Sequence, residues 1–173
     1  MFKNWKSLVP EDFAPESRVW VYQSNRLFFM AEALQIESIL EDFVANWNSH
    51  GDRVKGYANL LFGQFVVIIA DETVTGVGGC STDSSVRVIK EIEKLFKVNM
   101  LDRQTLAFIR NDKVECIPMS QFSYALENGL VTPDTLYFNN LVATKQDLLN
   151  QWVTPVKNSW LAKRFPLLNP DFC

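Results

Sequence analysis

The segment FVVIIA, at residues 65–70, constrains the fold more than any other stretch of this chain. A β-strand directs successive side chains to opposite faces of its sheet, and every position of this segment is apolar. Both faces of such a strand avoid water, so it belongs in the middle of a sheet rather than at an exposed edge. We therefore predict a central, buried strand over residues 64–71.

The segments on either side of this strand predict the rest of the fold. β-Branched and aromatic residues favour further strands, and a turn at Asn111-Asp112 joins the last two as a hairpin. Apolar residues at helical spacing predict two amphipathic helices. The strands are expected at residues 17–23, 54–62, 64–71, 105–110 and 113–117, and the helices at residues 36–47 and 84–96. This order is ferredoxin-like (βαββαβ), so we predict an α+β fold with an antiparallel or mixed sheet and both helices on one face.

The last third of the chain changes character. Residues 1–118 are expected to form the α+β core, and residues 119–173 a small C-terminal α/β appendage that packs on the core as one compact unit. Its aromatic residues either pack inside or form a docking surface for a protein partner or a second copy, because aromatic side chains anchor many interfaces. The candidates for such an interface are Trp152, Trp160 and Phe165.

Charge and hydropathy exclude several classes of function. The chain has 17 Lys and Arg residues scattered among 20 Asp and Glu residues, whereas nucleic-acid binding needs clustered positive charge. The longest apolar run, residues 60–70, is interrupted by Gly63 and Gln64 and is too short to cross a membrane. We therefore expect neither nucleic-acid binding nor membrane insertion.

The N-terminus and the cysteines predict a location. The first residues lack the continuous apolar segment of a signal peptide, and the three cysteines lack CxxC spacing. We therefore expect a cytoplasmic protein with reduced thiols. One histidine and scattered cysteines do not match a zinc site, and neither a metal nor a cofactor is expected.

The glycine- and serine-rich stretch GVGGCSTDSS, residues 76–85, is the strongest candidate for a ligand site. Free N–H groups at the start of the following helix attract anions, and glycines let a ligand approach the backbone. The alternative is a purely structural turn, in which Asp83 caps the helix and its carboxylate opposes an anion. A nucleotide-binding P-loop is excluded because the chain contains no Gly-Lys pair, so ATPase activity by that route is not expected. The predicted ligand-binding residues are Gly78, Gly79, Ser81, Thr82, Ser84, Ser85 and Arg87.

Cys80 is a candidate nucleophile within the same stretch. A thiol near a helix N-terminus has a lowered pKa, which makes the thiolate available for chemistry. Its partner would be His50 or Asp71, although His50 follows the first helix, where it is expected to interact with the last carbonyls. The alternative is a buried structural cysteine, which is a common fate for this residue.

Several stretches resemble a family of short, uncharacterised bacterial proteins that often carry the label ABC transporter ATPase. The resemblance covers approximately residues 17–164 and is carried by four stretches. They are RVWVYQSNR (18–26), GGCSTDSSVRVIKEIE (78–93), TPDTLYFNNLVATK (132–145) and PVKNSWL (155–161). The label implies ATP hydrolysis, for which this sequence lacks the Walker A lysine.

A second segment, VECIPMSQFSYALENGLVTPDTLYF (114–138), is similar to small bacterial modules related to the GYF domain. The residues that match are Pro118, Ser120, Gly129, Val131, Thr135 and Leu136. The resemblance implies that the C-terminal third is an interaction appendage. We therefore expect a non-enzymatic binding or interaction protein. The alternative is a protein that binds a small anion or phosphate ligand, or a thiol-dependent enzyme, centred on residues 76–87.

Overall fold

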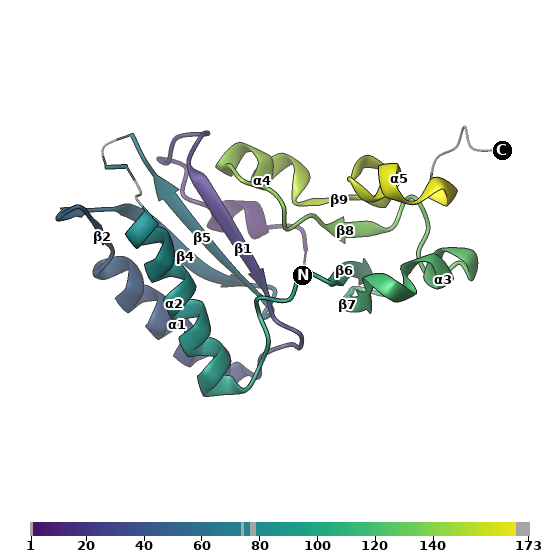
Figure 1. Ribbon diagram of the computed structural model, residues 1–173, viewed down its shortest axis with the longest axis horizontal. Coiled ribbons are helices and arrows are strands. Elements are labelled where there is room, and N and C mark those ends of the chain that lie inside the picture. The colour runs from purple at the N-terminus through teal and green to yellow at the C-terminus, as the bar shows by residue number, and fades with distance from the viewer. Residues whose placement is uncertain (1, 74, 77–78, 169–173) are drawn as a thin grey trace. The chain divides into compact units, whose positions relative to one another are not determined.

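The computed structural model describes residues 2–73, 75–76 and 79–168, with the backbone alone at residues 79–81 (Figure 1). The chain forms two compact units, each with its own antiparallel sheet and helices. The first unit comprises Met1–Leu101 and Val142–Leu149, and the second comprises Asp102–Leu141 and Asn150–Cys173. The predicted α+β class is confirmed. The division falls at residue 101 rather than at the predicted residue 118.

The first unit is built on a three-stranded antiparallel sheet. The central strand is the one predicted from FVVIIA, and all seven of its residues are buried. Its two neighbours pair with it along their lengths, so that Trp20 and Ala58 lie on either side of Ile68. In spatial order the strands are β1 (Arg18–Gln23), β5 (Phe65–Asp71) and β4 (Lys55–Leu61).

Two helices cover one face of this sheet, as predicted (Figure 1). Side chains from both helices pack with Val66, Ile68 and Ala70 of β5 in one hydrophobic cluster. Both helices begin earlier than predicted. The sequence signal for these starts is weak, because Phe29 precedes the first helix and forms no side-chain cap, and the second helix begins at a glycine. The helices are α1 (Met30–Ala45) and α2 (Gly79–Phe96). A short hairpin of β2 (Asn48–Ser49) and β3 (Asp52–Arg53) follows α1.

The N-terminal segment is tied to the end of β5 and to a late segment of the chain. The backbone N–H of Ala14 donates to the Asp71 carboxylate at 3.0 Å. The buried Lys145 ammonium donates to the carbonyls of Glu11 and Phe13 at 3.2 and 2.7 Å. These contacts are made after the 3-10 turn η1 (Trp5–Leu8), and Lys145 is the first residue of α4 (Lys145–Gln151).

One edge of β1 pairs with β5. Its other edge is covered by residues 142–145 and not by the predicted last strand of a ferredoxin-like sheet. The backbone N–H of Val19 donates to the carbonyl of Ala143 at 3.0 Å, and Arg18 forms an isolated bridge with Thr144. The strand that follows α2 pairs elsewhere, in the second unit. The structure therefore does not confirm the complete ferredoxin-like topology.

The second unit is built on a four-stranded antiparallel sheet, whose strands are labelled in Figure 1. The predicted hairpin is confirmed, and it turns at Asn111 and Asp112, both of which have the positive φ that tight hairpins require. In spatial order the strands are β7 (Lys113–Pro118), β6 (Thr105–Arg110), β8 (Leu136–Phe138) and β9 (Val153–Pro155). The helices are α3 (Phe122–Glu127) and α5 (Leu161–Arg164), with 3-10 turns η2 (Met119–Gln121), η3 (Val156–Asn158) and η4 (Pro166–Leu168).

Candidate functional site

Residues 79–85 of the predicted anion-binding stretch form the first turns of α2. Gly78 lies outside the described residues, as do the side chains of Gly79, Cys80 and Ser81. Ser85 is buried and its hydroxyl donates to the carbonyl of Thr82 at 2.6 Å, so it serves the helix itself. The half-buried Ser84 and the exposed Arg87 are the members of the set that line a hollow together.

The partners proposed for Cys80 have other positions and roles. His50 is exposed in the turn between β2 and β3, and not at the end of α1. The last carbonyls of α1 are instead satisfied by Asn46, whose side-chain amide donates to the carbonyl of Asp42 at 2.8 Å. The expected role of His50 as a helix cap is therefore wrong. The pairing of Cys80 with either partner stays a prediction, because its side chain lies outside the described part of the chain.

Asp71 is a structural anchor. Burial of its carboxyl opposes ionisation, but hydrogen bonds from the N–H groups of Ala14 and Thr73, both at 3.0 Å, outweigh that effect. The Lys55 ammonium, 3.5 Å from the carboxylate, adds to them, and together they lower the pKa of Asp71 to about 2. A carboxylate with such a pKa is a weak proton acceptor at neutral pH, so Asp71 is a poor general base.

The side chains predicted as an interface pack within the second unit. Trp152 is fully buried, and its indole N–H donates to the Asn140 side chain at 3.0 Å. Trp160 donates in the same way to the Tyr137 hydroxyl at 3.2 Å. The ring of Phe165 packs edge-on against that of Phe122, with their centroids 4.7 Å apart. These contacts fit the core alternative, and a fully buried Trp152 does not present a docking surface.

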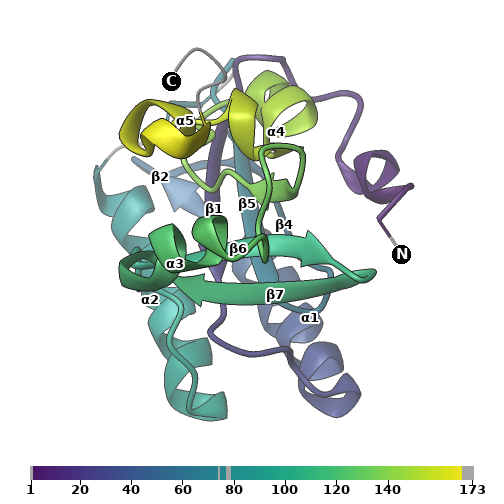
Figure 2. The same cartoon turned by 90° about the vertical axis from the view of Figure 1, so that its right-hand side faces the viewer.

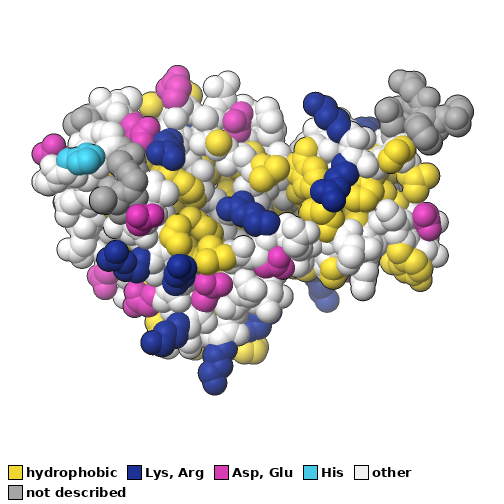
Figure 3. Space-filling model, viewed as in Figure 1, with side chains coloured by type: hydrophobic (Ala, Val, Ile, Leu, Met, Phe, Trp, Pro, Cys, Tyr) yellow, Lys and Arg dark blue, Asp and Glu magenta, His cyan; other side chains and the backbone are white. Residues whose placement is uncertain are grey.

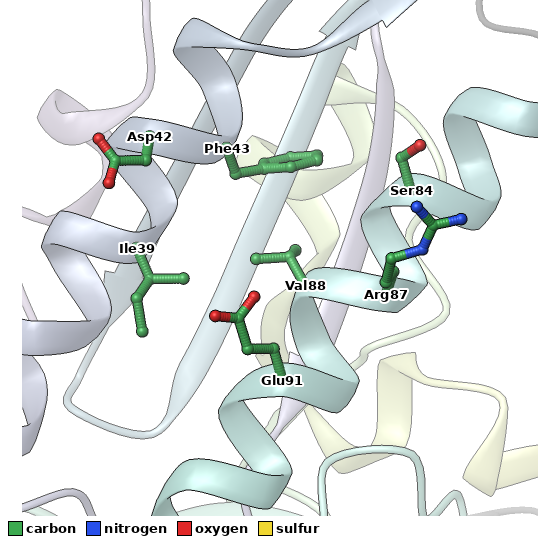
Figure 4. Close-up of a pocket in the computed structure, with 7 residues that line it drawn as sticks. All are labelled: Ile39, Asp42, Phe43, Ser84, Arg87, Val88 and Glu91. Carbon is green, nitrogen blue, oxygen red and sulfur yellow. The ribbon is translucent and has the colours of Figure 1, made fainter.

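A groove between α1 and α2 is the candidate site of the first unit that we describe. Its volume is about 350 Å³, near the lower end of the range of about 300–1,000 Å³ typical of ligand sites. The lining residues recur at helical spacing on the facing sides of the two helices, which is why they converge (Figure 4). They are Ile39, Asp42, Phe43, Ser84, Arg87, Val88 and Glu91.

The floor of this groove is apolar. Ile39 and Phe43 are one turn apart on α1, and Val88 faces them from α2 (Figure 4). Ile39 and Phe43 are only half-buried, so their side chains still meet solvent. Phe43 is held in place by the Trp47 ring, with the two ring centroids 4.9 Å apart. The floor is therefore a fixed apolar surface that a second molecule can cover.

The rim of the groove is charged, with the carboxylates of Asp42 and Glu91 and the guanidinium of Arg87. The Glu91 carboxylate lies towards Ile39, whereas the Arg87 guanidinium lies beside the Ser84 hydroxyl (Figure 4). Asp42 points away from α2. The whole of α1 carries four carboxylates and no basic side chain. The groove therefore favours a ligand that combines an apolar group with a positive charge.

The sequence pointed to Ser84 and Arg87 but not to the floor or the acidic rim. Ile39, Phe43 and Val88 belong to the apolar stripes that predict the two helices, and such residues are normally counted as core. The width of the apolar stripe on each helix could have indicated these residues, because residues at the margins of a wide stripe lie beyond the buried face of the helix.

Comparisons with known proteins identify no relative: no protein-family model, curated protein or solved structure matches the chain. The resemblances noted from the sequence therefore stay predictions. Within residues 2–73, 75–76 and 79–168, no helix has the length and apolar character needed to span a bilayer. The same part of the chain groups no three His, Cys, Asp or Glu side chains in a way that could hold a metal ion.

Proposed function

We propose that this chain is a non-enzymatic binding protein that accepts a short amphipathic peptide segment in the groove between α1 and α2. The observation that carries the proposal is the groove itself, in which the half-buried Ile39 and Phe43 form a solvent-facing apolar floor with Glu91 at its edge. Binding of an apolar face between two helices is a common mode of peptide recognition.

The chemistry of the ligand follows from the two parts of the groove. An apolar side chain covers the floor and gains free energy by leaving water, as do the floor residues themselves. A Lys or Arg beside it meets the carboxylates that line the groove, Glu91 and Asp42. Because these carboxylates are exposed, each ion pair contributes only about 0.2–1 kcal/mol, so the charge selects the ligand more than it tightens binding.

The experiment is a selection of peptides from a random displayed library, with the full chain as the target. The expected peptides share a large apolar residue next to Lys or Arg. In a two-dimensional NMR spectrum of the labelled protein, a selected synthetic peptide should shift the amide signals of Ile39, Phe43 and Val88. Shifts confined to other elements would refute the assignment.

Charge reversal at the rim then tests the role of the acidic group. Glu91→Lys replaces an attraction by a repulsion and should weaken binding about 5- to 10-fold at low salt, with a smaller effect at high salt. Glu41→Lys is the matched control, because Glu41 is an exposed carboxylate of α1 outside the groove lining. Equal losses of affinity in the two variants would contradict the proposal.

A second candidate function, binding of a small anion, is favoured by one observation. Ser84 and Arg87, both predicted as ligand-binding residues, line the same groove, with the guanidinium beside the hydroxyl (Figure 4). Inorganic phosphate should then raise the thermal midpoint of the wild type but not of Arg87→Gln. No rise in the wild type at millimolar phosphate would exclude this candidate.

A further inference from the structure

One end of the first unit exposes large apolar side chains, and these do not belong to the groove. They lie on the segment that leads into α1, on the first turns of α1 and on the last turn of α2. The exposed fractions are 55% for Leu27, 68% for Phe29, 82% for Met30, 63% for Leu34 and 56% for Leu95. We call these five residues the apolar end.

Side-chain contacts bring the two helix termini together at this end. The Arg26 guanidinium donates to the carbonyl of Phe96 at 2.9 Å, pairs with Glu32 at 3.0 Å and lies 5.2 Å from the centre of the Phe29 ring. The rings of Phe28 and Phe96 also meet edge-on, with their centroids 6.0 Å apart. Both views of the ribbon show the start of α1 and the end of α2 at the same end of this unit (Figures 1 and 2).

The stability of the fold does not explain these side chains. Phe28 is buried and contributes to the core, but Phe29 and Met30 project into solvent. Phe29 occupies the position before α1 where Ser, Thr, Asn or Asp would accept a backbone hydrogen bond, and its side chain forms none. A chain that gives up a helix cap for an exposed aromatic residue departs from the local rules of folding, and such departures are typical of functional surfaces.

Positive charge borders the apolar end. Lys94 and Lys97 are exposed on either side of the end of α2. Two of the nearby carboxylates have partners: Glu32 pairs with Arg26, and Glu93 accepts the backbone N–H of Met100 at 2.8 Å. Glu37, one turn beyond Leu34 on α1, is an exposed carboxylate. In Figure 3 the lower end of the first unit shows Lys or Arg side chains next to hydrophobic ones.

We propose that the apolar end docks on the surface of a membrane that contains anionic lipids. The protruding side chains enter the boundary between head groups and acyl chains, and Lys94 and Lys97 meet the anionic head groups. Individually protruding side chains of this kind suit a fluid lipid interface, whereas a protein interface has a close-packed core. This mode of binding needs no helix that spans the bilayer.

The test is co-sedimentation of the full chain with vesicles of phosphatidylcholine alone and with about one-third phosphatidylglycerol. Binding is expected to the anionic vesicles, with a decrease at high salt. Lys94→Glu with Lys97→Glu should lower the partition coefficient on anionic vesicles at least tenfold, since each lysine near such a surface contributes about 1 kcal/mol, a factor of about five. Absence of binding to both kinds of vesicle would overturn the proposal.

Phe29→Ser separates docking from folding, because it supplies a helix cap while it removes an exposed aromatic ring. It should raise the thermal midpoint and lower vesicle binding, so a binding loss is not a folding defect. The matched control is Tyr124→Ser on α3, whose side chain is 63% exposed, and it should leave vesicle binding unchanged. If Phe29→Ser instead abolishes a concentration-dependent self-association of the wild type without changing vesicle binding, the apolar end binds a second copy and the lipid proposal fails.

Discussion

Asp71 is expected to be one of the most important polar side chains for the stability of the first unit. Its carboxylate fixes the N-terminal segment through Ala14 and the turn after β5 through Thr73, and it pairs with Lys55. The pKa of the carboxyl falls from 3.8 to about 2 in the folded protein. Since one pKa unit corresponds to about 1.4 kcal/mol, the ionised form stabilises the fold by about 2 kcal/mol at neutral pH.

Asp71→Asn removes the charge while keeping the shape, so it should lower the free energy of unfolding by about 2 kcal/mol and the thermal midpoint by about 4–8 °C. The effect depends on pH with a defined sign. Because the folded-state pKa is depressed, the contribution is complete above the unfolded value of 3.8 and is lost as the pH falls towards 2. Urea unfolding from pH 7 to pH 2 should therefore show the wild type and the variant converging in acid.

Asp12→Asn is the matched control for this prediction. Asp12 also pairs with Lys55, at 3.3 Å, but its side chain is 75% exposed, so its loss should cost less than about 0.5 kcal/mol. Two results would refute the reasoning: Asp71→Asn within about 0.5 kcal/mol of the wild type at pH 7, or a difference between them that is the same at pH 7 and pH 2.

Three further predictions concern other points of the fold. Gly56→Ala places a Cβ 2.6 Å from Cε3 of Trp47, so it should destabilise the protein by about 1–3 kcal/mol and shift tryptophan emission, and an unchanged thermal midpoint would contradict the packing. Burial raises the pKa of Tyr137 to about 12, against the opposing hydrogen bond from Trp160, so stability should fall as the pH rises from 10 to 12. Tyr137→Phe should reduce that alkaline loss, of which Tyr57 keeps a share because burial also raises its pKa, and should cost about 1 kcal/mol at pH 7. Lys145→Met leaves two carbonyls without their buried donor, which should cost about 1–3 kcal/mol and expose residues 2–16 to limited proteolysis; wild-type resistance to the protease would argue against this role.

The central strand could be predicted because its signal is local and complete. A strand with two apolar faces has few possible places in a sheet, and FVVIIA occupies the expected one. The hairpin at Asn111 and Asp112 could also be predicted from the sequence, because the turn requires positive φ and these residues tolerate it. The other strands of the sheet that contains this hairpin could not be predicted from the sequence. An alternating pattern indicates which face of a strand is buried but not which strand lies alongside it.

Some residues of the candidate site could likewise be predicted from the sequence, and others could not. Ser84 and Arg87 follow a stretch rich in glycine and serine, which is a visible signal for a ligand site. Phe43 and Ile39 look like core residues in the sequence, because their half-exposure depends on how closely α2 packs beside α1. For Trp152 the sequence left core and interface open, and only the three-dimensional packing shows it fully buried.

The return of residues 142–149 to the first unit has a consequence for biosynthesis. The edge of β1 and the anchor of the N-terminal segment both depend on this late stretch, which is translated after the β6–β7 hairpin and β8. During translation the first unit therefore lacks its last segment until Lys145 has emerged from the ribosome, although β1 is among the first elements made. A nascent chain that stalls before that point carries an uncovered strand edge, and its exposure to chaperones and proteases is set by the speed of the ribosome rather than by the stability of the finished fold.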